Sequence, residues 1–194
     1  IVKQSAMKKS ESALADEDKT VDWTGPLVIL TSRVSASASE ILSGAMKDYN
    51  RAVIVGSDHT YGKGSIQTVM PIPGELGALK ITIGMFFTPG GYSTQHRGVE
   101  ADVRIPSPYE LDEIGETSMD YSLPPKKIDS FLSKDAYVEN GDDKWFQLKS
   151  DWMKTIKARS EERVSKNEEF KKITDELEKT KKLGKTIRVS DILK

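Results

Sequence analysis

The sequence of 194 residues contains no cysteine and only two histidines, His59 and His96. The lack of cysteine excludes a thiol nucleophile, a disulfide framework and a thiolate metal site. Two histidines are too few for a metal site with several imidazole ligands. We expect a protein that needs no metal and no other cofactor. A formal net charge of −1 gives no indication of a nucleic acid or an anionic membrane as a partner.

Long apolar runs are also missing. No run approaches the roughly 20 residues that a membrane-spanning helix needs, and no signal peptide is recognisable. The chain opens at Ile1 without a methionine, in a segment typical of the middle of a protein. We therefore expect a fragment, or a processed piece, of a longer protein.

The middle of the chain predicts an α/β core. Two short apolar runs, 27–30 and 52–55, are typical of strands that are buried on both faces. Between them lies a turn of small residues, and then apolar residues at helical spacing from Ile41 to Tyr49. A strand, a helix and a strand in this order predict a parallel pair with a right-handed crossover.

The remaining segments divide the chain into three parts. Residues 1–24 are polar and predict a surface segment or an insertion. Residues 25–125 hold the core, with further strands expected at 65–72, 78–88 and 99–105 and a loop from Pro106 to Pro125. Residues 126–194 predict a charged helical region, with a short helix near 128–132 and longer helical structure from 143 to about 183. There, Trp145 and Trp152 share one apolar stripe.

Ser37 lies between a buried strand and the start of the first predicted helix, among the small residues of Ser35 to Ser39. The unpaired N–H groups and the dipole of a helix start favour negative charge that develops there. Such a position suits a serine nucleophile. The plainer interpretation is that these serines only cap the helix, as we expect Ser39 to do.

Lys63 is flanked by Gly62 and Gly64, which allow a close approach to another segment of backbone. A lysine that is buried beside a serine can act as a base near neutral pH, as in known Ser–Lys pairs. Gln67 follows on the same face of the expected strand, and its amide could hold the lysine. Taken alone, each residue fits a surface turn or an exposed strand face equally well, and His59 fits a surface loop.

The order of these motifs is more specific than any one of them, and it resembles the C-terminal processing (tail-specific) protease family. The motifs that carry the resemblance lie in the following order: Ser35–Ile41 (SASASEI), Asp48–Tyr49, Arg51–Gly56 (RAVIVG), Tyr61–Gln67 (YGKGSIQ), Phe87–Gly91 (FTPGG) and Arg97–Asp102 (RGVEAD).

The resemblance implies a serine endopeptidase. In it, Ser37 matches the nucleophile, Lys63 the general base and Gln67 the residue that orients the lysine. The backbone N–H of Ala38 matches one oxyanion donor, and Asp48 a structural carboxylate near the site. Ser37 and Lys63 are 26 positions apart, one more than we expect in the family, and we place the extra residue in the loop 57–60, where a change of length is tolerated.

The resemblance also implies a crotonase- or ClpP-like fold, of which this chain holds the C-terminal part. The family's PDZ domain and the glycine-rich loop that gives the second oxyanion donor are not in this sequence. The charged tail is similar to that of the long, tail-specific branch, which implies a periplasmic protein that cleaves extended or unfolded polypeptides near their C-termini.

Two alternatives remain open at this point. The chain could be a non-catalytic binding or scaffold module, or a crotonase-type enzyme acting on acyl-CoA, although no CoA-binding pattern is recognisable. The helical tail could bind an adaptor or mediate self-assembly, or it could be a cap packed on the core.

Overall fold

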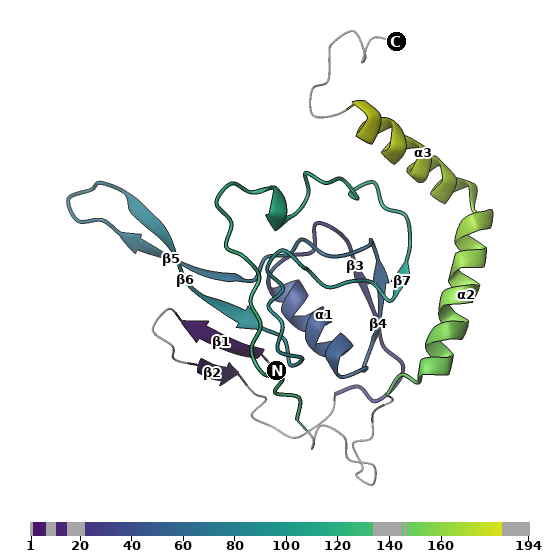
Figure 1. Cartoon of the computed structure of the whole chain (residues 1–194), viewed down its shortest axis with the longest axis horizontal. Coiled ribbons are helices and arrows are strands. Elements are labelled where there is room, and N and C mark those ends of the chain that lie inside the picture. Colours follow the sequence, from purple (N-terminus) through teal and green to yellow (C-terminus); the bar gives the residue numbers. More distant parts are fainter. Residues whose placement is uncertain (1, 7–10, 15–21, 134–144, 146, 184–194) are drawn as a thin grey trace.

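The computed structural model describes residues 2–6, 11–14, 22–133, 145 and 147–183, which form two β-sheets and three α-helices (Figure 1). The first sheet is antiparallel, with the strand order β2-β1-β6-β5, and the second is parallel, with the order β3-β4-β7. The core combines several strands with the single helix between β3 and β4, which agrees with the α/β core that the sequence predicts.

The antiparallel sheet draws two of its strands from the first residues of the chain. Strand β1 (Val2–Ala6) pairs with β2 (Glu11–Leu14) on one side and with β6 (Ala78–Phe87) on the other, and β5 (Ser65–Pro71) completes the sheet. The segment 1–24, expected to be a polar surface segment, therefore contributes to a sheet. Sequence patterns missed β1 because one apolar residue, the buried Val2, carries its packing.

The parallel sheet positions the first helix. Strand β3 (Val28–Thr31) runs parallel to β4 (Val53–Gly56), and helix α1 (Ala38–Asp48) connects the two, which confirms the predicted parallel pair. The central strand β4 is the most buried, as a strand with neighbours on both sides and side chains covered on both faces should be.

Figure 1 shows α1 between the two sheets. Its apolar side packs into the core through Ala45, which is 2% exposed, and Gly44 lies against Thr88, directly after β6. Most of the other buried apolar residues lie in strands, and Ala52 and Val99 lie outside them. Those in strands are Val2, Val53, Ile54, Met85, Phe86, Phe87 and Val103.

Two predicted elements form differently. The strand expected at 99–105 shortens to β7 (Val103–Arg104), because the residues before it hydrogen-bond to the loop 58–60 and not to a continuous neighbouring strand. The short helix expected near 128–132 is absent. There the N–H of Ile128 donates to Gly91 O and that of Phe131 to Pro89 O, so tertiary contacts take the groups that a helix would use.

Two helices follow in the C-terminal region, α2 (Ser150–Lys166) and α3 (Glu168–Leu183), where one helical region was expected. Asn167 separates them in an extended conformation, and its Oδ1 accepts the N–H groups of Glu169 and Phe170 at the start of α3. Trp145 precedes α2, so it does not share a helical face with Trp152.

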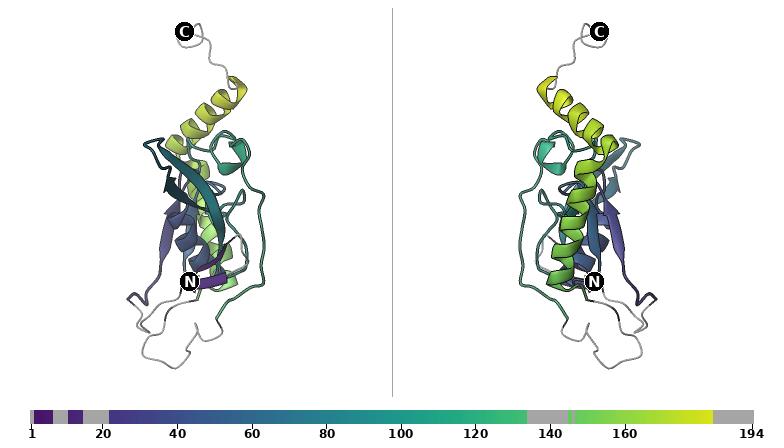
Figure 2. Two further views of the ribbon diagram at one scale, coloured as in Figure 1. Left: turned by 90° about the vertical axis from the view of Figure 1, so that its left-hand side faces the viewer. Right: turned by 90° about the vertical axis from the view of Figure 1, so that its right-hand side faces the viewer.

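Figures 1 and 2 show α2 running beside the parallel sheet, which it contacts at β7, while α3 projects away from the core. Within the described residues, no helix is long and apolar enough to cross a membrane.

Gly56, at the end of β4, gives a test of this packing. A Cβ there would overlap the carbonyl oxygen of Thr31 on the paired strand β3. We expect Gly56→Ala to lower the free energy of unfolding by about 3 kcal/mol, measured by denaturant unfolding. Gly74→Ala is the control, because Gly74 also has a positive φ but nothing within 4 Å of its Cβ position. Equal costs for the two variants would contradict the proposed overlap.

Candidate active site

Ser37 occupies a strained position at the start of α1. Strand β3 ends at Thr31, and a turn closed by the hydrogen bond from Ser35 N–H to Ser32 O (2.9 Å) leads to Ser37. Ser37 is the N-cap residue, with φ 58° and ψ −112°, a conformation that a non-glycine residue adopts only when its surroundings impose it. The N-cap of α1 is therefore Ser37, whereas the sequence suggested Ser39. The side chain of Ser37 is partly exposed, and Ser37 and Glu40 form a capping box at the start of α1.

Ala38 is the first residue of α1, so its N–H has no partner inside the helix. No other described residue accepts a hydrogen bond from this N–H. Ala38 is exposed, and its amide directly follows the Ser37 hydroxyl in the chain. A free helix-start amide next to a nucleophile can stabilise an oxyanion.

The side chain of Glu40 is the centre of the site. It is 0% exposed, and its two carboxylate oxygens accept four hydrogen bonds. Oε2 accepts the backbone N–H of Ser37 and that of Lys63, both at 2.9 Å. Oε1 accepts the N–H of Gly62 at 2.7 Å and the hydroxyl of Thr60. One oxygen atom thus joins the backbones of the predicted nucleophile and the predicted base.

The environment of Glu40 shifts its proton affinity. Burial raises the pKa of the Glu40 carboxyl above its ordinary value, although the hydrogen bonds from Thr60, Gly62, Ser37 and Lys63 oppose this effect. Burying an acid is costly unless the lost water contacts are replaced. Here three backbone amides and one hydroxyl replace them.

The backbone of residues 61–64 is fully hydrogen-bonded: all four N–H groups and all four C=O groups have partners. Glu40 accepts two of the N–H groups, and the segment 93–96 binds several of the remaining groups. Gly62 has φ +91° and lies against the backbone of His96, and Gly64 lies against Ser93, so neither position has room for a side chain. The remaining partners are Ser35 O for Tyr61 N–H, Glu116 N–H for Tyr61 O and Phe86 N–H for Gly64 O.

The side chain of Lys63 is half-buried and hydrogen-bonds to Ser65. Its Nζ donates to Ser65 O at 3.1 Å and to Ser65 Oγ at 3.4 Å. It makes no hydrogen bond to the Ser37 hydroxyl or to the Gln67 amide. Gln67 is exposed on β5, two residues beyond Ser65. The structure therefore brings the backbones of Ser37 and Lys63 together, while the two side chains are not in contact.

Asp48 lies at the other end of α1 from Ser37. Its Oδ2 accepts the N–H of Gly90 at 2.7 Å, and a Cβ on Gly90 would meet this carboxylate. Asp48 thus attaches the turn after β6 to the C-terminal end of α1. The contact is a structural one, at the end of α1 that lies away from Ser37.

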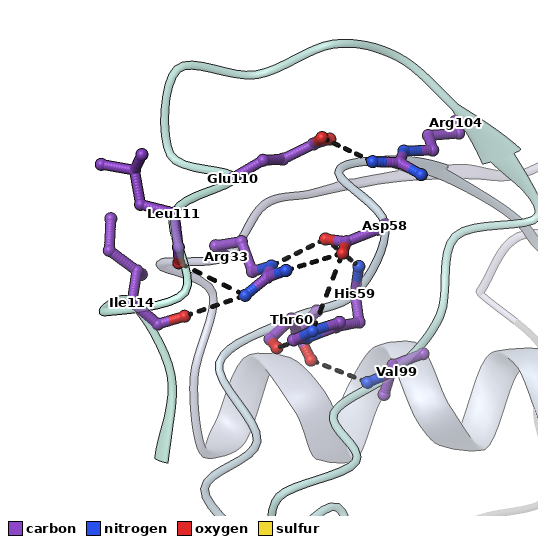
Figure 3. Close-up of polar contacts among 9 residues, drawn as sticks. All are labelled: Arg33, Asp58, His59, Thr60, Val99, Arg104, Glu110, Leu111 and Ile114. Carbon is purple, nitrogen blue, oxygen red and sulfur yellow. Dashed lines mark hydrogen bonds and ion pairs between the residues drawn. The ribbon is translucent and has the colours of Figure 1, made fainter. Parts of the chain in front are cut away.

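The loop 57–60 is more constrained than its sequence suggested. Thr60 is fully buried, and its hydroxyl also accepts the N–H of Val99 at 2.8 Å. Asp58 binds the Arg33 guanidinium through two hydrogen bonds of 2.7 Å each, and Arg33 also donates to the carbonyls of Leu111 and Ile114 (Figure 3). His59 lies partly buried in the same loop, with Nδ1 2.6 Å from Thr60 O.

The residues that the sequence did not single out are Glu40, Thr60 and Gln95. Each is 0% exposed and polar, and each hydrogen-bonds to the backbone or to a side chain that belongs to the site. In the sequence, Glu40 is only one residue of the motif Ser35–Ile41. Its spacing of three residues from Ser37 is that of a capping box, and this was the one local signal for its role.

No group of three or more acidic or histidine side chains among the described residues could hold a metal ion. The chemical groups that the site presents are the partly exposed hydroxyl of Ser37, the backbone amide of Ala38 beside it and the side chain of Lys63.

Comparison with known proteins identifies the family of this chain. The model of peptidase family S41 matches residues 1–105. The chain belongs to peptidase family S41. The matched residues include Ser37, Glu40 and Lys63, and they end one residue after β7.

Among curated relatives, a tail-specific protease of Haemophilus influenzae is 34% identical over 169 residues, which is 84% of this chain. A carboxy-terminal-processing protease of Bartonella bacilliformis is 40% identical over 103 residues, or 52% of this chain. Among solved structures, a photosystem II D1 C-terminal processing protease is 42% identical over 41% of this chain, with a TM-score of 0.38. The chain spans about a quarter of the length of the two curated relatives, 23% of each.

Glu40→Gln tests the central contact. The substituted amide has one oxygen fewer for the four donors and turns its own NH₂ toward some of them. We expect a loss of about 2–3 kcal/mol in the free energy of unfolding, because buried donors lose a charged acceptor. Glu178→Gln on the exposed surface of α3 is the control. Denaturant unfolding measures both variants, and a neutral Glu40→Gln would contradict the anchoring role of the carboxylate.

The ion pair of Asp58 and Arg33 should make the free energy of unfolding depend on pH. Burial by itself would raise the pKa of Asp58, but the hydrogen bonds from Arg33 and from His59 N–H outweigh it, so this pKa lies below its ordinary value. The pair therefore adds stability above the unfolded-state pKa of about 3.9, and this contribution is lost as the pH falls through the lower folded-state pKa.

We expect the wild type to exceed Asp58→Asn in unfolding free energy by about 1–2 kcal/mol at pH 7. The difference should shrink below about pH 4. Chemical unfolding at a series of pH values measures it, with the exposed Asp120→Asn as control. A difference that is constant down to pH 2 would exclude the ion pair as its source.

Proposed function

We propose that this chain carries the nucleophile and the general base of a serine endopeptidase, with Ser37 and Lys63 as a Ser–Lys dyad. One observation supports this most directly. Oε2 of Glu40 lies 2.9 Å from the backbone nitrogen of Ser37 and 2.9 Å from that of Lys63, so the two nitrogens are within twice that distance of each other. The backbone N–H groups of two residues that are 26 positions apart thus donate to the same oxygen atom.

The reaction follows from the groups at the site. The neutral amine of Lys63 takes the proton of the Ser37 hydroxyl, and Ser37 Oγ attacks the carbonyl carbon of the scissile bond. The N–H of Ala38 stabilises the resulting oxyanion, and one such donor is worth about 3–4 kcal/mol. The lysine then protonates the leaving amine, an acyl-enzyme remains, and Lys63 activates the water that hydrolyses it.

This reaction requires the amine of Lys63 to leave Ser65. Lys63 Nζ now lies 3.1 Å from Ser65 O and 3.4 Å from Ser65 Oγ, and the second distance exceeds the usual range for an N–H···O hydrogen bond. We assign Gln67 to orienting Lys63 when the lysine faces Ser37, since the Gln67 amide is otherwise uncommitted among the described residues. Asp48 acts structurally through Gly90.

We further infer that the whole protein cleaves extended or unfolded polypeptides near their C-termini and works in the periplasm. This inference rests on the resemblance to the long, tail-specific branch. In the same way, the chain would be the C-terminal part of a crotonase- or ClpP-like core followed by its charged helices. Upstream segments would supply the PDZ domain and the second oxyanion donor. Helices α2 and α3 would bind an adaptor, mediate self-assembly or cap the core.

A second function is possible for this chain alone, that of a non-catalytic scaffold. The contact between Lys63 and Ser65, in place of a contact with Ser37, is the observation that favours it. Intact Ser37 and Lys63 favour the enzyme.

Substitution of the dyad decides between these two functions. In the longer protein that carries this chain, Ser37→Ala and Lys63→Ala should each lower kcat for an unfolded polypeptide by about 10⁴-fold or more. The matched controls are Ser39→Ala, an exposed serine two residues away, and Lys172→Ala, an exposed lysine on α3. Cleavage is followed by electrophoresis and folding by circular dichroism. Full activity of either dyad variant would refute the assignment, and an inactive wild type would favour the scaffold.

A further inference from the structure

The side chain of Gln95 connects the Lys63 loop to a distant segment of the chain. It is 0% exposed. Its Oε1 accepts the N–H of Gly64 at 2.8 Å, and its Nε2 donates to Oε1 of Glu116 at 3.1 Å. A single buried amide thus uses both its acceptor and its donor to join residues 64 and 116.

Glu116 makes a second contact with the same loop, because its own N–H donates to Tyr61 O at 2.9 Å. Glu116 begins the 3₁₀ turn Glu116–Ser118 within residues 106–122, a segment that we call the strap. The strap therefore holds the loop 61–64 at both ends, at Tyr61 and at Gly64. Glu40 holds the two residues between them.

Two arginines attach the strap to the core (Figure 3). Arg33 donates to the carbonyls of Leu111 and Ile114 while it is paired with Asp58, and Arg104 pairs with the buried Glu110 at 2.7 Å. His96 Nε2 lies 2.7 Å from the Ser122 hydroxyl at the end of the strap. These contacts hold the strap on the core without any help from Glu116. They therefore fix the position of Glu116 relative to the core.

We propose that Glu116 is a positioning residue that sets the place of Lys63 through Gln95 and Tyr61. This inference rests on the proposed Ser37–Lys63 reaction. Glycines on both sides of Lys63 leave the backbone of the loop flexible by itself. Hydrogen bonds from other segments therefore determine the position of the Lys63 Cα, from which the side chain extends. Because the side chain must swing from Ser65 to Ser37, a small displacement of its backbone changes its reach, and misplacement by 1 Å can cost about 100-fold in rate.

The chemistry of the pair allows a reciprocal test. Gln95→Glu alone places two carboxylates face to face, and an ionised carboxylate has no proton to donate. The double variant Gln95→Glu/Glu116→Gln restores a complementary pair with its direction reversed. The new amide at position 116 then donates to the new carboxylate at position 95, whose other oxygen still accepts from Gly64.

The first measurement is kcat and KM for peptide cleavage by the longer protein that carries this chain. We expect Gln95→Glu to lower kcat about 10- to 100-fold, with KM within about 2-fold, and the double variant to recover most of the loss. Glu113→Gln, an exposed glutamate of the same strap, is the control and should leave kcat unchanged. An unchanged kcat in Gln95→Glu, or a double variant no better than the single one, would overturn the proposal.

A second measurement does not depend on activity. Hydrogen exchange of the Gly64 amide should accelerate in Gln95→Glu and slow again in the double variant. If the wild type cleaves nothing while Gly64 exchange follows this pattern, the proposed reaction is wrong and the role of Gln95 in holding the loop stands. If Gly64 exchange is the same in all three proteins, the positioning role is wrong.

Should Gln95→Glu fail to fold, Glu116→Leu breaks the same contact from the less buried end. A lower kcat at unchanged KM supports the proposal, and an unchanged kcat overturns it.

Discussion

The carboxylate of Glu40 is the interaction on which the site depends. It is completely buried, yet its two oxygens accept three backbone amides and one hydroxyl, from residues 37, 60, 62 and 63. A buried charge without partners would be costly, so the carboxylate and its donors constrain each other. The strained φ of Ser37 and the turn at Gly62 persist because the same group binds both.

The sheet topology makes this meeting possible. Strands β3 and β4 are parallel and paired in register, so their carboxyl ends lie at one edge. The turn that leads to Ser37 follows β3, and the loop that leads to Lys63 follows β4. In open α/β sheets, the segments after the carboxyl ends of parallel strands build the functional sites. Helix α1 returns the chain between the two strands and presents Glu40 from its first turn.

Further layers of contacts surround this centre. The segment 93–96 and the strap, residues 106–122, bind the groups of the Lys63 loop that Glu40 leaves free, and Arg33 with Asp58 fastens the strap. Every backbone N–H and C=O group of residues 61–64 is therefore hydrogen-bonded. No hydrogen bond joins the side chains of Ser37 and Lys63.

The sequence by itself determined the family resemblance, the parallel pair β3–β4 and the candidate pair Ser37 and Lys63, because these depend on local periodicity and on ordered short motifs. Tertiary structure decided what local patterns do not contain. Residues 3–6 pair with β6, and the N–H of Ile128 donates to Gly91 O, so a strand formed where none was expected and a helix did not form. Likewise, Glu40, Thr60 and Gln95 are ordinary polar residues in sequence. Their roles arise only because folding buries them, where each polar group must find a partner.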